Sequence, residues 1–136
     1  MMSDFGDPPS PLAIDTELQG EDSARLSPAG ELDIATVPQL ERVLSSLLSR
    51  GVRQIAVDLS QVMFIDSSAL RMFIVLNARA ASEDWSLRIV NPSEQARSVF
   101  EITGAEQHLR VESEPGDTRF QVSPKSRERN RNCEPR

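Results

Sequence analysis

The sequence predicts a small single α/β domain with a mixed sheet of four or five strands. Apolar segments typical of strands alternate with segments whose apolar residues recur at helical spacing, in the order strand, strand, helix, strand, helix, strand, helix, strand. Parallel strands need crossover connections, so this alternation predicts a largely parallel sheet with an antiparallel pair at its start. The length of 136 residues is enough for one core.

Composition sets the expected boundaries of this domain. Residues 1–11, "MMSDFGDPPSP", are rich in Pro and Asp, so we expect a disordered segment there, a domain over 12–112 and a disordered basic tail over 113–136. Residues 1–112 carry 9 Arg against 17 Asp and Glu, a net charge of −8, whereas 113–136 carry 6 Arg and Lys against 4 acids, a net charge of +2. An acidic body argues against a nucleic-acid partner.

Two strands and a helix are predicted in the first half of the domain. The strands cover 12–19 and 24–33, and because Pro28 and Gly30 interrupt the second, we expect an edge position or a bulge there. Thr36 is the predicted N-cap of the helix, with Gln39 as its capping-box partner. Gly51 follows the helix end. The apolar stripe of this helix consists of Val37, Leu40, Leu44 and Leu47.

The second half continues the alternation. Residues 52–59 are apolar on both faces, which predicts an inner strand, and a helix is expected from about 67 to 82. A strand over 86–90 leads into a third helix, with Asn91 as predicted cap, Pro92 in its first turn and Gly104 at its end. Residues 108–112 are the predicted last strand.

Several kinds of site and location are not expected. The N-terminus lacks a basic segment followed by an apolar run, and no stretch of about 18 apolar residues occurs, so we expect a cytoplasmic protein without membrane insertion. The single cysteine, Cys133, lies in the polar tail and has no disulfide partner in the chain. The sequence has neither Cys/His metal-ligand spacing nor a phosphate-binding glycine loop, so no cofactor is expected.

The most informative segment is "VMFIDSSALRMFIVL", residues 62–76, in which Asp66, Ser67 and Ser68 separate two apolar stretches. One interpretation is structural, because a helix start leaves about four backbone N–H groups unbonded and Asp or Ser can accept from them. One cap uses only one residue, however. If Asp66 or Ser67 is the cap, Ser68 keeps a hydroxyl that another protein can recognise or modify.

Catalysis by these serines is disfavoured. A serine nucleophile normally needs a histidine base within hydrogen-bond reach. The only histidine, His108, lies 40 residues after Ser68, and neither serine lies in a Gly-x-Ser-x-Gly turn. We therefore expect a protein that is not an enzyme. Phosphorylation is the alternative use of an exposed serine, because a phosphate adds about −1.5 to −2 charges that a helix N-terminus tolerates and a docked partner does not.

The segments "GELDIAT" (30–36), "VDLSQVMFIDSSAL" (57–70) and "NPSEQARSVFEITG" (91–104) resemble, in order and spacing, the STAS domains of bacterial anti-sigma factor antagonists. The resemblance implies an α/β domain with helices mainly on one face of a mixed sheet. It also implies binding to an anti-sigma factor that is a serine kinase, phosphorylation that ends binding, and a phosphatase that restores it.

In this family pattern the phosphoacceptor corresponds to Ser68, with Ser67 as the alternative. Asp66 and Ser67 match the positions before it and are expected to take part in recognition or capping. Many family members have Gly after the acceptor, whereas this chain has Ala69, whose methyl group is expected to narrow the approach of a kinase. A scaffold or transporter-associated subunit without a phospho-switch is the main alternative function. A nucleotide-binding module is a second alternative, with no base-stacking pocket evident in the sequence.

Further residues near the motif are candidate partner-binding residues. Arg71 follows Ser68 by three residues and faces nearly the same way, so it can pair with a phosphate or with an acidic group of the partner. Met72, Val75 and Leu76 either belong to a deeply covered helix or form an exposed docking patch. Glu31 and Asp33 either support the loop beside the motif or are ordinary turn residues.

Overall fold

The computed structural model describes residues 12–114, so the predictions for residues 1–11, for Cys133 and for most of the C-terminal tail lie outside the described residues. The elements are β1 (Ala13–Leu18), β2 (Ser23–Leu32), α2 (Val37–Ser49), β3 (Gln54–Asp58), β4 (Val62–Ile65), α3 (Ser67–Glu83), β5 (Ser86–Val90), α4 (Glu94–Thr103), the 3₁₀ helix η1 (Ala105–Gln107) and β6 (Val111–Glu112).

The strands form the predicted mixed sheet. Their order is β1-β2-β3-β5-β6, with β1 antiparallel to β2 and the other neighbours parallel, and β4 pairs with β2 beyond the end of β3. The α/β fold class is confirmed. Including β4, the sheet has six strands rather than four or five, because the four residues of β4 look from sequence like a simple approach to the next helix.

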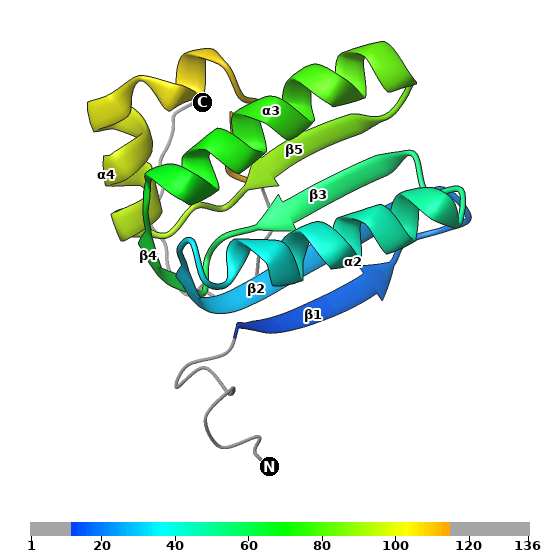
Figure 1. The fold of residues 1–136 in the computed structure, drawn as a ribbon, viewed down its shortest axis with the longest axis horizontal. Helices are drawn as coiled ribbons and strands as arrows, with labels where there is room; N and C mark the ends of the chain where they lie inside the picture. The colour runs from blue at the N-terminus through cyan, green and yellow to red at the C-terminus, as the bar shows by residue number, and fades with distance from the viewer. Residues whose placement is uncertain (1–11, 115–136) are drawn as a thin grey trace, which may run out of the picture.

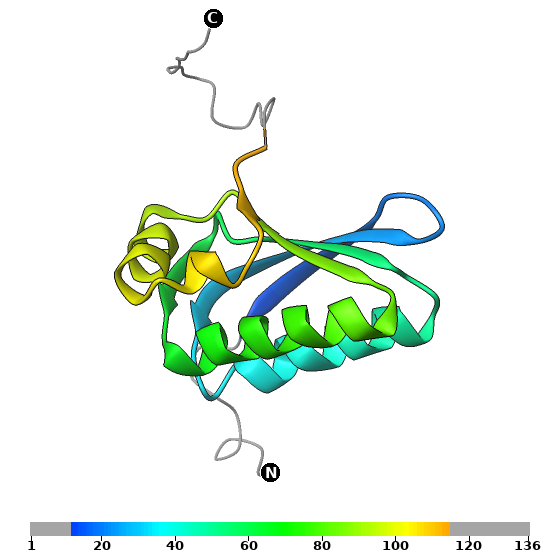
Figure 2. The same ribbon diagram turned by 90° about the horizontal axis from the view of Figure 1, so that it is seen from above.

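Two helices cover one face of this sheet. Figures 1 and 2 show α2 and α3 side by side on that face, while α4 lies at the end of the sheet beside β4. The core between the layers includes Phe73 and Phe100, each at most 1% exposed, and the predicted stripe of α2 is buried in it. Burying one such large side chain stabilises the fold by roughly 1.5–3 kcal/mol.

Within the described residues, no helix combines the length and the apolar character needed to cross a bilayer.

Strand β2 lies inside the sheet, so the expected edge position is wrong, whereas the expected bulge is present. The pairing of β2 with β3 ends at Leu26, and its pairing with β4 begins at Gly30, with a register shift between Gly30 and Glu31. On this side of β2, Pro28 lies between the two parallel ladders, where a missing N–H is tolerated, while on the other side it is in register with Ile14 of β1. Gly30 has φ +123°, a conformation that favours glycine.

The cap of α2 differs from the prediction. Thr36 occupies the N-cap position, but its hydroxyl donates to the carbonyl oxygen of Glu31 (2.7 Å) and caps no N–H of the helix. Gln39 is not a capping-box partner, because its Oε1 accepts from the N–H of Leu12 (3.3 Å) and so holds the start of β1. Thr36 thus bonds to the segment just before the helix, and Gln39 bonds to a residue distant in sequence, in place of the predicted capping bonds.

The cap of α4 is also corrected. Ser93, not Asn91, is the N-cap, and its Oγ accepts from the N–H of Ala96 (3.1 Å). Asn91 has φ +49°, which asparagine tolerates better than most residues, and its Oδ1 accepts from the N–H of Glu114 (2.8 Å). Asn91 therefore holds Glu114, at the end of the described residues, against the domain.

Ion pairs cover the opposite face of the sheet from α2 and α3. Arg25 contacts Asp58 (2.6 Å) and Glu114 (2.7 Å), while Arg88 contacts Glu112 (3.2 Å). The Asp58 side chain is 1% exposed. Burial alone would raise the pKa of Asp58, but hydrogen bonds from Ser60, Arg25 and Asn91 outweigh it and hold that pKa below its ordinary value.

The pKa of Asp58 is lower in the folded state than in the unfolded state, so its ionised carboxylate stabilises the fold at pH values above the unfolded-state pKa of about 4. This stabilisation is lost as the pH falls through the folded-state pKa. We expect Asp58→Asn to lower the free energy of unfolding at neutral pH by about 1–3 kcal/mol. We also expect the variant to lose stability less steeply than the native chain in acid. Urea unfolding at a series of pH values measures both effects, and equal stability of the two proteins at neutral pH would contradict the prediction.

Candidate functional site

The candidate site is built on the junction between β4 and α3. Asp66 is the N-cap of α3, and its Oδ1 accepts from the backbone N–H groups of Ser68 (2.9 Å) and Ala69 (3.2 Å). Its own N–H donates to the carbonyl oxygen of Leu32 (3.1 Å), which ties the helix start to the end of β2. This geometry confirms Asp66 as the cap, one of the two sequence-based alternatives.

Neither serine after the cap is needed for this structure. Ser67 is exposed and Ser68 is half-buried, and among the described residues neither hydroxyl forms a hydrogen bond. Both hydroxyls are therefore available to another molecule, at a helix N-terminus where backbone dipoles favour an added negative charge.

Ala69 does not obstruct this surface. It is fully buried, with 0% of its surface exposed, so its methyl group packs in the core and not against a protein that approaches Ser68. The expectation that this methyl narrows the approach of a kinase is therefore wrong. The difference from the family's Gly affects the packing under the helix start.

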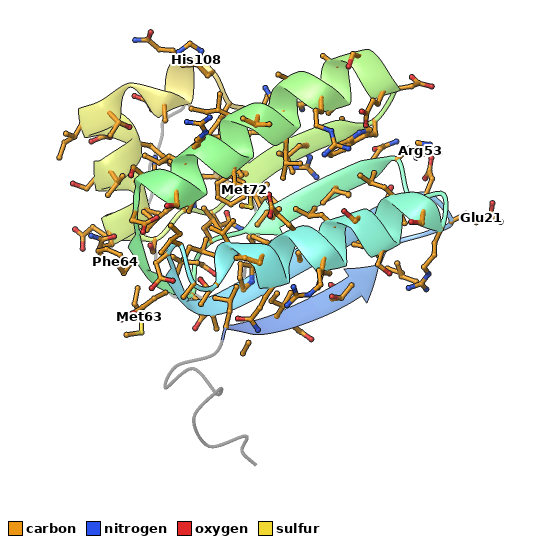
Figure 3. The ribbon with its side chains drawn as sticks, in the orientation of Figure 1. Glu21, Arg53, Met63, Phe64, Met72 and His108 are labelled. Carbon is orange, nitrogen blue, oxygen red and sulfur yellow. The ribbon has the colours of Figure 1, made fainter. Side chains whose placement is uncertain are left out.

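The outward face of α3 contains only part of the predicted docking patch. Arg71 is exposed, and Val75, one turn later, is 48% exposed. Met72 and Leu76 are 5% and 7% exposed, so for these two residues the covered-helix alternative is confirmed and the docking-patch alternative is wrong. Both belong to the core cluster, and Figure 3 places Met72 on the side of α3 that faces α2. Met72 is therefore removed from the candidate partner-binding residues.

An open groove of about 720 Å³ lies between α3 and the end of α4. It begins at the two serines and ends at α4, and its lining residues are Ser67, Ser68, Leu70, Arg71, Ile74, Val75 and Thr103. The structure thus brings together Ser67, Ser68, Arg71 and Val75, four of the residues singled out from sequence.

Glu31 and Asp33 lie at the same end of the domain as the motif. Glu31 pairs in register with Phe64 of β4, and Asp66 is bonded to Leu32 between the two acids. Asp33 is a turn residue, because its Oδ1 accepts from the N–H groups of Ala35 (2.9 Å) and Thr36 (3.1 Å). The Glu31 side chain is exposed and remains a candidate contact.

Exposed apolar side chains beside the motif were missed by the sequence analysis. Met63 and Phe64 of β4 are 70% and 43% exposed, and Ile34, in the turn after β2, is 75% exposed. Figure 3 shows Met63 and Phe64 pointing away from the domain at the same end of the sheet. A four-residue apolar run carries no periodicity that separates exposed from buried positions, so no sequence signal marked these residues.

The structure does not support a serine–histidine pair. His108 follows η1, and its carbonyl oxygen accepts from Asn77 Nδ2 (2.9 Å), so it lies beside the middle of α3. Asn77 is nine residues after Ser68, a separation of about 13 Å along a helix that rises 1.5 Å per residue. His108 is therefore not placed to act as a base for either serine in the described fold.

Comparisons with known proteins define the class. A family profile described as "Mlab, STAS domain" matches residues 16–111. The anti-sigma-B factor antagonist of Staphylococcus aureus is 38% identical to this chain over 82 residues, which covers 60% of this chain and 76% of that protein. The chain therefore belongs to the STAS-domain family of anti-sigma factor antagonists.

Solved structures agree with this fold. The anti-sigma factor antagonist SpoIIAA in its unphosphorylated form is similar with a TM-score of 0.65 and 20% identity, over 81% of this chain and 95% of that one. The phosphorylated form of SpoIIAA from Bacillus gives a TM-score of 0.59 at 20% identity, over 82% of this chain and all of that one. At this level of identity the similarity concerns the fold alone.

Because Asp66 satisfies two N–H groups of α3, we expect Asp66→Ala to lower the free energy of unfolding by about 1 kcal/mol, within the 0.5–2 kcal/mol typical of lost N-caps. Asp66→Asn keeps an acceptor oxygen and is expected to lose much less. Ser67→Ala serves as the matched control, with almost no change. Denaturant unfolding of the three variants measures the effect, and equal stabilities for Asp66→Ala and Ser67→Ala would show that the cap has no energetic role.

Proposed function

We propose that this chain is a binding protein that captures an anti-sigma factor, itself a serine kinase, and thereby frees a sigma factor in the cytoplasm. Phosphorylation of Ser68 by that kinase ends the binding, and a phosphatase restores it. The names of its relatives support the anti-sigma factor as partner. The observation that supports the switch is that, within residues 12–114, neither serine hydroxyl forms a hydrogen bond at a helix start that Asp66 already caps.

Ser68 is favoured over Ser67 because it lines the groove next to Arg71, at a spacing of three residues on the helix. The greater exposure of Ser67 keeps it as the alternative acceptor. A phosphate at either position stays close to the N-terminus of α3, and neither hydroxyl holds a structural bond that phosphorylation would break. The modification is therefore expected to leave the fold intact.

Loss of binding follows from the surroundings of the serines. Asp66 and the exposed Glu31 already make this end of the domain acidic, and Ile34, Met63 and Phe64 add exposed apolar area. A partner that covers this surface would have to desolvate the added dianion or face it with its own charges. Such a penalty of a few kcal/mol corresponds to about a hundredfold loss of affinity or more.

The proposed contact surface unites residues from three elements around Ser68. Its members are Glu31, Asp33, Asp66, Ser67, Arg71 and Val75, with Ile34, Met63 and Phe64 added from the structure. Asp33 contributes mainly by shaping its turn, since its carboxylate is already bonded to two backbone N–H groups. Arg71 is the basic member of the set and can pair with the phosphate once it is added.

The proposed switch is tested with the purified serine-kinase anti-sigma factors encoded in the same genome. We expect one of them to bind the unmodified chain and, with ATP, to phosphorylate the 62–76 peptide at Ser68, as located by mass spectrometry. We expect the phosphorylated chain, and Ser68→Glu, to bind that kinase about a hundredfold more weakly.

Ser68→Ala and Ser67→Ala are the matched controls for this experiment. Ser68→Ala should bind like the native chain and take up no phosphate, whereas Ser67→Ala should still be phosphorylated. Phosphate on Ser67 alone would move the acceptor by one residue and keep the mechanism. Absence of both binding and phosphorylation with every kinase would reject the switch and favour the scaffold function.

A further inference from the structure

The groove between α3 and the end of α4 extends well beyond the two serines. Leu70 and Ile74 lie along its α3 side, Val75 follows one turn after Arg71, and Thr103 closes it from α4. An apolar depression whose lining includes an exposed apolar side chain, here Val75, is typical of a surface that a partner covers.

Hydrogen bonds fix the two sides of this groove relative to each other. Asn77 Nδ2 on α3 donates to the carbonyl oxygen of His108 (2.9 Å), which holds the segment after α4 against α3. Gly104 ends α4 in the left-handed conformation (φ +75°), and its N–H bonds to the carbonyl oxygen of Phe100. The groove is thus preformed, which lowers the entropic cost of binding.

Charge at the groove favours an acidic group in the partner. Arg71 is exposed at the rim, and among residues 12–114 it has no ion-pair partner. Arg42, Arg50, Arg53 and Arg97 likewise form no ion pair among the described residues, but of these arginines it is Arg71 that lines this groove. An arginine held over an apolar groove can make a charge-assisted, bidentate bond to a carboxylate of a docked protein.

We propose that this groove is a second part of the docking surface, which accepts an apolar side chain of the anti-sigma factor while Arg71 pairs with an acidic residue beside it. The inference rests on the proposed function and adds the chemistry of the partner to it. Ser68 lies at the same groove, so a phosphate there would compete with the partner's acidic residue for Arg71. The switch would then remove an attractive contact as well as introduce a repulsive charge.

The experiment measures the affinity of the unmodified chain for the purified anti-sigma factor identified by its binding, without ATP. Val75→Glu places a charge in the groove, and Arg71→Glu reverses the charge at its rim. Both positions are exposed helix positions, and Glu is a good helix former, so both variants are expected to fold. Ala81→Glu, at an exposed position of α3 nearer its C-terminal end, is the matched control, and circular dichroism checks all three folds.

We expect about a tenfold or greater loss of affinity for Val75→Glu and for Arg71→Glu, and native affinity for Ala81→Glu. One outcome separates the two proposals: the native chain binds the kinase, Ser68→Glu binds it more weakly, and both groove variants bind it like the native chain. The groove would then not be a docking site, and the proposed switch would stand. Equal losses for all three helix variants would also overturn the groove proposal, because the effect would then be general charge repulsion. If the native chain binds no such kinase, the proposed function itself is wrong and the groove proposal falls with it.

Discussion

The proposed docking surface depends on how the start of α3 is bonded. Asp66 accepts from two N–H groups of the helix and donates its own N–H to Leu32 at the end of β2. One residue therefore links the helix to the sheet through its backbone N–H and caps the first turn of the helix through its carboxylate. This cap uses neither Ser67 nor Ser68, and in the part of the chain that the structure describes both hydroxyls are without hydrogen bonds, at positions that line the groove.

The same junction gathers chemically different groups at one end of the domain. Acidic residues and exposed apolar side chains from β4 and the turn after β2 lie on one side of the serines. Arg71 and the groove toward α4 lie on the other side. The stabilising core lies between the sheet and the two helices beneath this surface, so in the proposed switch a charge added at the serines acts at the surface and leaves the core packing unchanged.

Local patterns predicted much of this arrangement. The helical stripe of α2 and the cap at Asp66 follow from periodicity and from backbone chemistry, which involve only near neighbours in sequence. Thr36 is the N-cap residue of α2 as predicted but lacks the capping bond, and Asn91 is not the cap of α4. Both differences share one cause, because these side chains bond to other groups, the carbonyl oxygen of Glu31 and the N–H of Glu114. The burial of Met72 against α2 and the exposure of Phe64 depend on tertiary packing, which a single sequence does not reveal.

The central claim is that negative charge at the start of α3 abolishes docking and spares the fold. The most direct measurement compares the thermal midpoints of the native chain and of the same chain phosphorylated stoichiometrically at Ser68. The account predicts a difference of less than about 4 °C, which corresponds to roughly 1 kcal/mol or less for a domain of this size. A fall of 10 °C or more would show that the phosphate acts by unfolding the domain and would contradict the account.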